Sequence, residues 1–362
     1  VFLFLLSHPL PASADIKVVA VGDVMLGSWY PSPRLLPESK MREAVRGVKS
    51  HMPKADISIL NLEGVLIDSG KPAKKEGKSY HFAMPSRYGK YIEEMGFNVA
   101  SLSNNHIMDF GWEGFINTTR VLESQGLKYA GLNGKIAEFS VGDKKVCVVA
   151  FDFSTAEKSF SILNIAMAKR VVAKLKKEHD ILIVSFHGGR EGYERTENKM
   201  ERFLKEERGN LVAFSRAVID AGADLVIGHG PHLPRAMELY KGKLIAYSLG
   251  NFFTYGRFDI KGACGYAPML YVVLDEKGDF KEGRIIPFKQ IAGGVPVFDK
   301  EGKAISWILR LTKLDFPNTP LTIERNGVVR KQEPKSYKPL SQPLPQRDNG
   351  SRIDHSLRIP QG

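Results

Sequence analysis

The sequence contains only two cysteines among its 362 residues. This scarcity excludes a disulfide scaffold, a Cys-rich zinc module and an iron–sulfur protein. The G-x-G-x-x-G, G-x-x-x-x-G-K-[ST] and G-x-S-x-G motifs are also missing, which argues against a dinucleotide fold, a P-loop and a serine-hydrolase elbow. No apolar run reaches the ~20 residues that a membrane-spanning helix needs. Any metal must therefore be held by oxygen and imidazole ligands.

The composition is that of a globular protein with a basic excess. Hydrophobic residues make up 43% and charged residues 25%, and the formal net charge is +12. These values exclude wholesale disorder and collagen-like repeats, and the length allows one large domain or two smaller ones. The basic residues are spread along the chain without an aromatic-interleaved stripe, so we expect no nucleic-acid partner. A weak attraction to anionic polymers or membrane surfaces stays open.

Two terminal segments differ from the rest of the chain. Residues 1–6 are apolar, and Ala-Ser-Ala at 12–14 resembles the cleavage site of a secretory signal. We interpret residues 1–14 as a signal peptide remnant, with a buried N-terminal strand as the alternative, and expect the protein to be periplasmic, secreted or cell-surface. The Pro-rich residues 330–362 predict a disordered tail, which leaves one folded body at 15–329.

Short β-branched runs alternate with helical stretches along this body. Strands are expected at 16–21, 57–60, 99–102, 146–151, 181–186, 225–227 and 244–247. Helices are expected at 40–50, 87–95, 112–124, 166–178 and 199–221. Near-continuous apolar strands that alternate with helices predict an α/β fold with both sheet faces covered. Residues 269–274 and 284–288 have no helix between them and predict an antiparallel hairpin.

Polar residues follow six of the expected strands at the point where each strand ends. Ligands of α/β proteins bind outside the carboxyl ends of strands, so we expect these side chains to converge. Oxygen and imidazole donors suit Zn, Mn, Fe or Mg, and two such ions ~3.5–4 Å apart would use six protein ligands. We predict one or two divalent metal ions held by Asp23, Glu63, Asn105, His187, His229 and His232.

His106 directly follows Asn105 in the sequence. From this position it is expected to face the substrate and to protonate a leaving group. Asp109 is expected to orient His106. Alternatively, Asp109 is the N-cap of a helix that begins near Gly111, and both roles can hold together.

Four further residues near the strand ends are candidates for substrate binding. Arg190 and Arg235 would bind phosphate or carboxylate bidentately, and the alternative for each is a surface ion pair. Asn61 and Asn251 would contact substrate, or they would be turn formers that tie loops to each other.

At these residues the sequence resembles the capsule-synthesis CapA family, the poly-γ-glutamate biosynthesis proteins of the calcineurin-like metallophosphoesterase superfamily. The resembling segments are VGDVMLG from Val21, NLEGVL from Asn61, SLSNNHIMDFG from Ser101, VSFHGGREGY from Val184 and GADLVIGHGPHLPRAMELYKGKLIAYSLGNF from Gly222. The resemblance implies a metallophosphoesterase-like α/β sandwich of two sheets flanked by helices, with a metal site at the strand C-terminal ends. It also implies the same six metal ligands, with His106 as the acid near the substrate.

The sequence departs from the family pattern at several positions. The first motif is usually Asp-x-His, whereas Asp23 is followed by Val24 and Met25, so one metal ligand is missing. The bridging position carries Glu63 rather than Asp. Gly188 stands where close relatives often carry Trp, and we expect this change to open the pocket.

The resemblance implies a role in the synthesis or export of poly-γ-glutamate or another capsule polymer. The candidate site predicts metal-dependent hydrolysis of a phosphoester in an anionic small-molecule or polymer substrate. One alternative is hydrolysis of a γ-glutamyl amide by the same metals. Another is a non-catalytic, polymer-binding component of an envelope or capsule assembly. Membrane proteins of capsule synthesis are candidate partners.

Overall fold

A computed structural model describes residues 15–37, 39–73, 80–154 and 159–332 of the chain. The expected signal peptide remnant at 1–14 lies outside these residues, as does the expected tail from residue 333 onward. Strand β20 (Val328–Lys331) continues past the expected end of the folded body at Val329. The domain boundaries themselves stay predictions.

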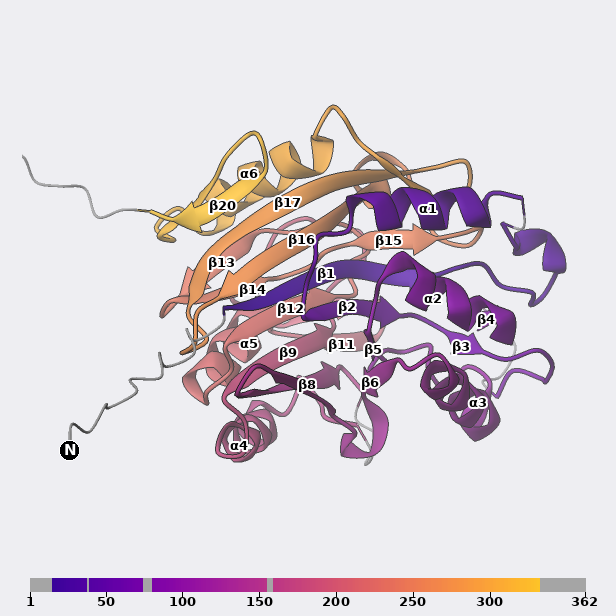
Figure 1. Ribbon diagram of the computed structural model, residues 1–362, viewed down its shortest axis with the longest axis horizontal. Coiled ribbons are helices and arrows are strands. Elements are labelled where there is room, and N and C mark those ends of the chain that lie inside the picture. The colour runs from indigo at the N-terminus through magenta and orange to yellow at the C-terminus, as the bar shows by residue number, and fades with distance from the viewer. Residues whose placement is uncertain (1–14, 38, 74–79, 155–158, 333–362) are drawn as a thin grey trace, which may run out of the picture. The chain divides into compact units, whose positions relative to one another are not determined.

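Two large β-sheets form the centre of the body (Figure 1). The strands of the first sheet are β1 (Ile16–Met25), β2 (Ile57–Leu62), β5 (Val99–Ser101), β6 (Lys128–Ala130), β15 (Asn251–Thr254), β16 (Tyr266–Leu274), β17 (Phe280–Ile291), β18 (Val295–Phe298), β19 (Leu321–Ile323) and β20. Their order is β19-β20-β17-β16-β1-β2-β5-β6, with β15 also paired to β1 and β18 to β17. Strands β1, β2, β5 and β6 are parallel, whereas β16 is antiparallel to β1.

The second sheet has the order β13-β14-β12-β9-β8-β7. Its strands are β7 (Ala137–Val141), β8 (Lys144–Asp152), β9 (Ile181–His187), β12 (Leu225–His229), β13 (Met237–Tyr240) and β14 (Lys243–Ala246). Strands β8, β9, β12 and β14 are parallel, and antiparallel strands lie at both edges. Two small two-stranded sheets pair β3 (Val65–Leu66) with β4 (Ala83–Met84) and β10 (Glu201–Phe203) with β11 (Glu206–Gly209).

Helices cover the outer faces of both large sheets. The α-helices are α1 (Met41–His51), α2 (Gly89–Met95), α3 (Gly111–Ser124), α4 (Ile165–Lys176), α5 (Leu211–Asp220) and α6 (Lys303–Asp315). Short 3-10 helices lie at Pro33–Leu35, Ser86–Tyr88, Leu132–Gly134 and Gly262–Gly265. Helices α1, α2 and α3 pack on the first sheet, and α4 and α5 pack on the second (Figure 1). Among the described residues, no helix combines the length and the apolar character needed to cross a bilayer.

The core is built by alternation along each strand, because successive side chains point to opposite faces of a sheet. In β1, Val18 points into the layer between the two sheets, and Val19 points toward the helices. In β9, Ile183 lies in the same inter-sheet layer, and Val184 packs under the helices of the second sheet. Because both faces are buried, these strands are apolar at nearly every position.

The structure confirms the α/β fold class with two sheets flanked by helices. It also confirms the antiparallel hairpin, which is β16 paired with β17. The expected helix over 199–221 is wrong in its first half, where β10 and β11 form a hairpin. Gly209 has a φ of +96°, and Asn210 caps α5 through a hydrogen bond from the N–H of Ala213, so the helix begins only at Leu211.

Candidate metal centre

Asp23 lies near the end of β1, where β15 begins. In the sheet register Asp23 pairs with Asn61 of β2 on one side and with Asn251 of β15 on the other. A Cβ atom on Gly22 would lie 1.8 Å from the carbonyl oxygen of Gly250, so no other residue fits there without a backbone shift. The N–H of Asp23 donates to that same carbonyl at 2.8 Å. Packing therefore requires glycine at position 22, and the adjacent backbone hydrogen bond fixes the position of Asp23.

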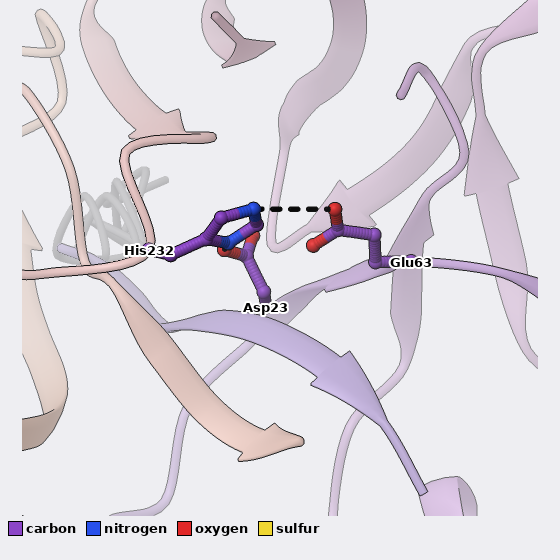
Figure 2. Close-up of side chains that lie close together, drawn as sticks. All are labelled: Asp23, Glu63 and His232. Carbon is purple, nitrogen blue, oxygen red and sulfur yellow. Dashed lines mark hydrogen bonds and ion pairs between the residues drawn. The ribbon is translucent and has the colours of Figure 1, made fainter. Parts of the chain in front are cut away.

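Asp23, Glu63 and His232 bring their ligand atoms within 4.8 Å of one another, as Figure 2 shows. The Nδ1 atom of His232 donates to Oδ2 of Asp23 at 2.9 Å, and its Nε2 atom lies 3.8 Å from Oε1 of Glu63. His232 has a φ of +60°, a left-handed conformation that costs about 1 kcal/mol in a non-glycine residue. The contact with Asp23 helps to hold the imidazole in this strained position.

Glu63 is fully buried, and neither of its oxygens makes a hydrogen bond to a described residue. Three imidazoles face its Oε1 atom: Nε2 of His187 at 3.5 Å, Nε2 of His232 at 3.8 Å and Nε2 of His106 at 4.0 Å. His187 and His229 are also buried, and their ring nitrogens have no hydrogen-bond partner among the described residues. Each unsatisfied buried polar group costs about 1–3 kcal/mol. A divalent cation fits this set of oxygen and nitrogen donors.

The protonation states of these groups follow from burial and mutual charge. Burial, followed by the charge of Asp23, raises the pKa of Glu63 to about 8. Burial lowers the pKa of His187 to about 3 and that of His229 to about 4, so both rings are neutral at pH 7. Burial alone would lower the pKa of His232, but the carboxylates of Glu63 and Asp23 raise it to about 10. In the cation-free protein at pH 7, Glu63 is therefore protonated and His232 carries a proton on both ring nitrogens.

His106 lies beside this cluster on the loop after β5. Its Nδ1 atom donates to Oδ2 of the buried Asp109 at 2.8 Å, and the same oxygen accepts the N–H of Phe82 at 2.9 Å. The N-cap alternative for Asp109 is wrong, because the N-cap residue of α3 is Phe110, one position later. With Nδ1 committed to Asp109, the Nε2 atom is left facing Glu63. The geometry fits the expected acid, and the role itself stays a prediction.

A family model described as "Bacterial capsule synthesis protein PGA_cap" matches residues 17–255. The chain belongs to this family. It is 26% identical over 256 residues to "Capsule biosynthesis protein CapA" of Bacillus anthracis, an alignment that covers 66% of this chain and 59% of the relative. It is 28% identical over 248 residues to "PGA biosynthesis protein CapA" of Bacillus subtilis, with 64% and 61% covered. The chain thus matches about three fifths of the length of these two PGA_cap relatives.

Solved structures similar to this PGA_cap chain include a 5'-nucleotidase precursor from Thermus thermophilus. That structure has a TM-score of 0.40 and 12% identity, and the match covers 83% of this chain and 59% of that one. A second is the purple acid phosphatase PPD1 from yellow lupin, with a TM-score of 0.37 and 10% identity, covering 81% and 55%.

The structure corrects the substrate-binding expectation for Asn61. This residue is fully buried in the PGA_cap protein, and its amide nitrogen donates to Oδ1 of Asp23 at 2.8 Å. Its amide oxygen accepts a hydrogen bond from Asn104 at 3.0 Å, and the Oδ1 atom of Asn104 accepts the N–H of His106 at 3.0 Å. Asn61 therefore orients Asp23. Sequence reasoning missed Asn104, for which the Asn-Asn doublet before His106 was the only available signal.

Two other expectations at the site are also wrong. Asn251 is fully buried, and its amide nitrogen donates to the carbonyls of Asp259 and Cys264, so it ties loops together and is not open to substrate. Gly188 does not open the pocket. A Cβ atom there would lie 2.3 Å from Cδ1 of Ile162 and 2.8 Å from the carbonyl oxygen of Arg208, so the space is already filled.

Arg235 is not a substrate ligand either, because its side chain is fully buried. Its Nη1 and Nη2 atoms pair with the two carboxylate oxygens of Glu201 at 2.8 and 2.9 Å, and its Nε atom donates to the carbonyl of Tyr193. The ion-pair alternative is correct in kind, but the pair is internal rather than on the surface. Arg190 is exposed, with its guanidinium 5.2 Å from the ring centre of Tyr193, and its substrate role stays a prediction.

Replacing Arg235 with methionine is expected to lower the free energy of unfolding by about 3 kcal/mol, because it leaves the Glu201 charge buried and unpaired. Urea denaturation would measure this change. The affinity of the folded variant for a divalent cation should equal that of the wild type. The exposed Arg190→Met variant is the control and should change stability by less than about 0.5 kcal/mol. A normal stability of Arg235→Met combined with weakened substrate binding would contradict the structural role.

Cation binding is expected to release protons at neutral pH. Glu63, with a pKa of about 8, and His232, with a pKa of about 10, hold protons at pH 7 in the cation-free protein, and a metal ligand must lose them. Because each released proton makes affinity tenfold stronger per pH unit, the affinity for Mn²⁺ should rise more than tenfold per unit between about pH 6 and 7.5. Calorimetry in buffers of different ionisation enthalpy counts the protons. An affinity that does not change over this range would contradict the placement of these protons.

Proposed function

We propose that this PGA_cap protein is a metal-dependent hydrolase of the phosphoester type. The observation that carries the proposal is Glu63, a fully buried carboxylate whose oxygens lack hydrogen bonds to described residues and face three imidazoles. A carboxylate in such surroundings is costly to bury unless a cation compensates it. The imidazoles come from segments that are far apart in the sequence, so no single turn accounts for their meeting.

The candidate ligands divide into two groups that share Glu63. Asp23, Glu63 and His232 would hold one divalent cation. Glu63, with Asn105, His187 and His229, would hold a second; the two buried histidines are neutral at pH 7 and offer lone pairs. Mn, Zn, Fe and Mg all suit these donors. A divalent cation supplies Lewis acidity toward a phosphoryl oxygen and lowers the pKa of water at neutral pH.

His106 would supply the proton that the leaving group needs. Asp109 keeps a proton on Nδ1, so the transferable proton is on Nε2, the nitrogen that faces the cluster. The ring of Phe82 packs against His106, with 4.2 Å between the ring centres, and limits its rotation.

The test is metal analysis followed by matched assays. The purified protein is loaded with Mn²⁺, Zn²⁺, Fe²⁺ or Mg²⁺ and assayed with bis-p-nitrophenyl phosphate, p-nitrophenyl phosphate and γ-glutamyl-p-nitroanilide. The proposal expects cation-dependent hydrolysis of a phosphate ester. Hydrolysis of the anilide alone would favour the γ-glutamyl amide alternative. Cation binding without turnover of any substrate would favour a polymer-binding component, and failure to bind any cation would contradict both hydrolase hypotheses.

We further propose that the substrate is a capsule polymer or its precursor and that the partners are membrane proteins of capsule synthesis. The names of the relatives, which refer to capsule and PGA biosynthesis, support this assignment. The sequence pattern of residues 1–14 supports a location outside the cytoplasm.

A further inference from the structure

A cavity of about 580 Å³ lies beside the candidate metal centre, with Asn105 in its wall. Apolar side chains from three parts of the chain form much of the lining: Ile107, Met108, Leu132, Phe153 and Leu163. Three carboxylates complete it, from Asp152, Glu206 and Glu207. No lysine, arginine or histidine is present among the described lining residues. The described lining is therefore acidic, which favours a cation over an anion.

Asp152 differs from the other two carboxylates of the cavity. Glu206 pairs with Arg208 at 2.9 Å, and Glu207 pairs with Arg202, so both charges are compensated. Asp152 is only 2% exposed, and within the described part of the chain it has no cationic partner. Its Oδ1 atom accepts the N–H of Ser154 at 2.7 Å, which leaves Oδ2 for a ligand.

The position of Asp152 connects the cavity to the candidate centre. It is the last residue of β8 and pairs in register with His187, the last residue of β9. The ring of Phe153 lies 6.0 Å from the ring of His187, between centres. A substrate bound with one end at the metal centre would thus place a neighbouring group in the cavity. Burying a carboxylate without a cation is unfavourable, so a cation from outside would compensate the charge that the described residues leave unpaired.

We propose that this cavity binds an ammonium group carried on a short apolar stem of the substrate, with Asp152 as its anionic partner. The inference rests on the proposed function for the remainder of the substrate, whose anionic group would lie at the cations. The substrate is then zwitterionic around the reacting bond, and a uniformly anionic chain does not suit the cavity. The apolar residues Ile107, Leu132 and Leu163 would contact the stem, and Asp152 would select the charge at its end.

The first experiment compares 2-aminoethylphosphonate with ethylphosphonate by calorimetry on the Mn²⁺-loaded protein. Because the two phosphonates also ionise differently, the quantity compared is the change in their affinity ratio between wild type and Asp152→Asn. We expect the preference for the amine to fall at least about tenfold in Asp152→Asn. The Asn side chain keeps an oxygen for the N–H of Ser154, and a thermal unfolding curve checks that the variant is folded.

Glu207→Gln is the matched control, because Glu207 lines the same cavity but is already paired with Arg202. Its affinity ratio should stay within about twofold of wild type. An unchanged ratio in Asp152→Asn, or an equal fall in both variants, overturns the assignment of Asp152.

A second measurement separates this inference from the proposed function. If neither phosphonate binds the loaded protein, the hydrolase proposal fails. The cavity is then tested with n-butylammonium chloride alone, by ligand-observed NMR. Binding by wild type that is lost in Asp152→Asn and kept in Glu207→Gln supports the ammonium site, and no binding by wild type overturns it.

Discussion

Replacing Glu63 with glutamine is expected to abolish cation retention and to lower kcat/KM for phosphoester hydrolysis by about 10³-fold or more. Glutamine keeps the shape of the side chain but removes the charge that both candidate cations would share. Metal content after gel filtration and initial rates with bis-p-nitrophenyl phosphate measure the two effects. Wild-type rates in a variant with wild-type metal content would overturn the bridging role.

The stability of the cation-free Glu63→Gln variant provides the control. The pKa of Glu63 is raised from its ordinary value of 4.5 to about 8, so its buried carboxyl is neutral at pH 7 and a neutral amide replaces it at little cost. A raised pKa contributes stability that is fully present below pH 4.5 and is lost as pH rises through 8. The cation-free wild type should therefore lose stability relative to the variant as pH rises from 4.5 to about 8, and little more above that. A variant that is far less stable at pH 7 would indicate that loss of activity follows from misfolding.

Replacing His106 with alanine is expected to lower kcat by about 10²–10⁴-fold while metal content stays at the wild-type level. The His106 Nε2 atom faces the cluster and lies 4.0 Å from Oε1 of Glu63. This distance is too long for a hydrogen bond between them, so Nε2 is available to act on a substrate. The loss should be large for a phosphate ester with an alkyl leaving group. It should be much smaller for a p-nitrophenyl ester, whose leaving group needs no proton.

Asp109→Asn is the companion variant, because it changes only the partner of the His106 Nδ1 atom. We expect an intermediate loss of kcat, since an amide no longer fixes the proton of His106 on Nδ1 as the carboxylate does. Equal losses of His106→Ala on both ester types would show that His106 is not the general acid.

The sequence predicted that side chains at strand ends would meet. Within one sheet the reason is that neighbouring parallel strands such as β9 and β12 end at the same edge, whereas the packing of one sheet against the other is not visible in the sequence. Asp23, His187 and His229 all belong to strand ends of this kind, and the structure brings them to one cluster. The α/β fold was predictable for a related reason: strands buried on both faces lack polar positions, and this pattern is visible without a structure.

The wrong predictions concern polar residues that were expected to be exposed because they are polar. Arg235 and Asn61 are polar residues beside a predicted site, and nothing in their sequence context indicates that each is fully buried with internal partners. The hairpin before α5 was missed because its two strands are short and together with α5 resemble one amphipathic stretch. For Arg235 and Asn61 the deciding contact joins residues far apart in the chain, Arg235 with Glu201 and Asn61 with Asp23.

The candidate ligands come from both large sheets. Asp23 and Glu63 belong to β1 and the end of β2, whereas His187 and His229 terminate β9 and β12. An ion bound among them would link the two sheets, which also pack through apolar side chains such as Ile59 and Ile183. Any substitution that lets one layer slide by a fraction of an ångström would misalign the donors. Residues in the layer between the two sheets would thereby affect the chemistry as strongly as the ligands, although they lie far from the ion.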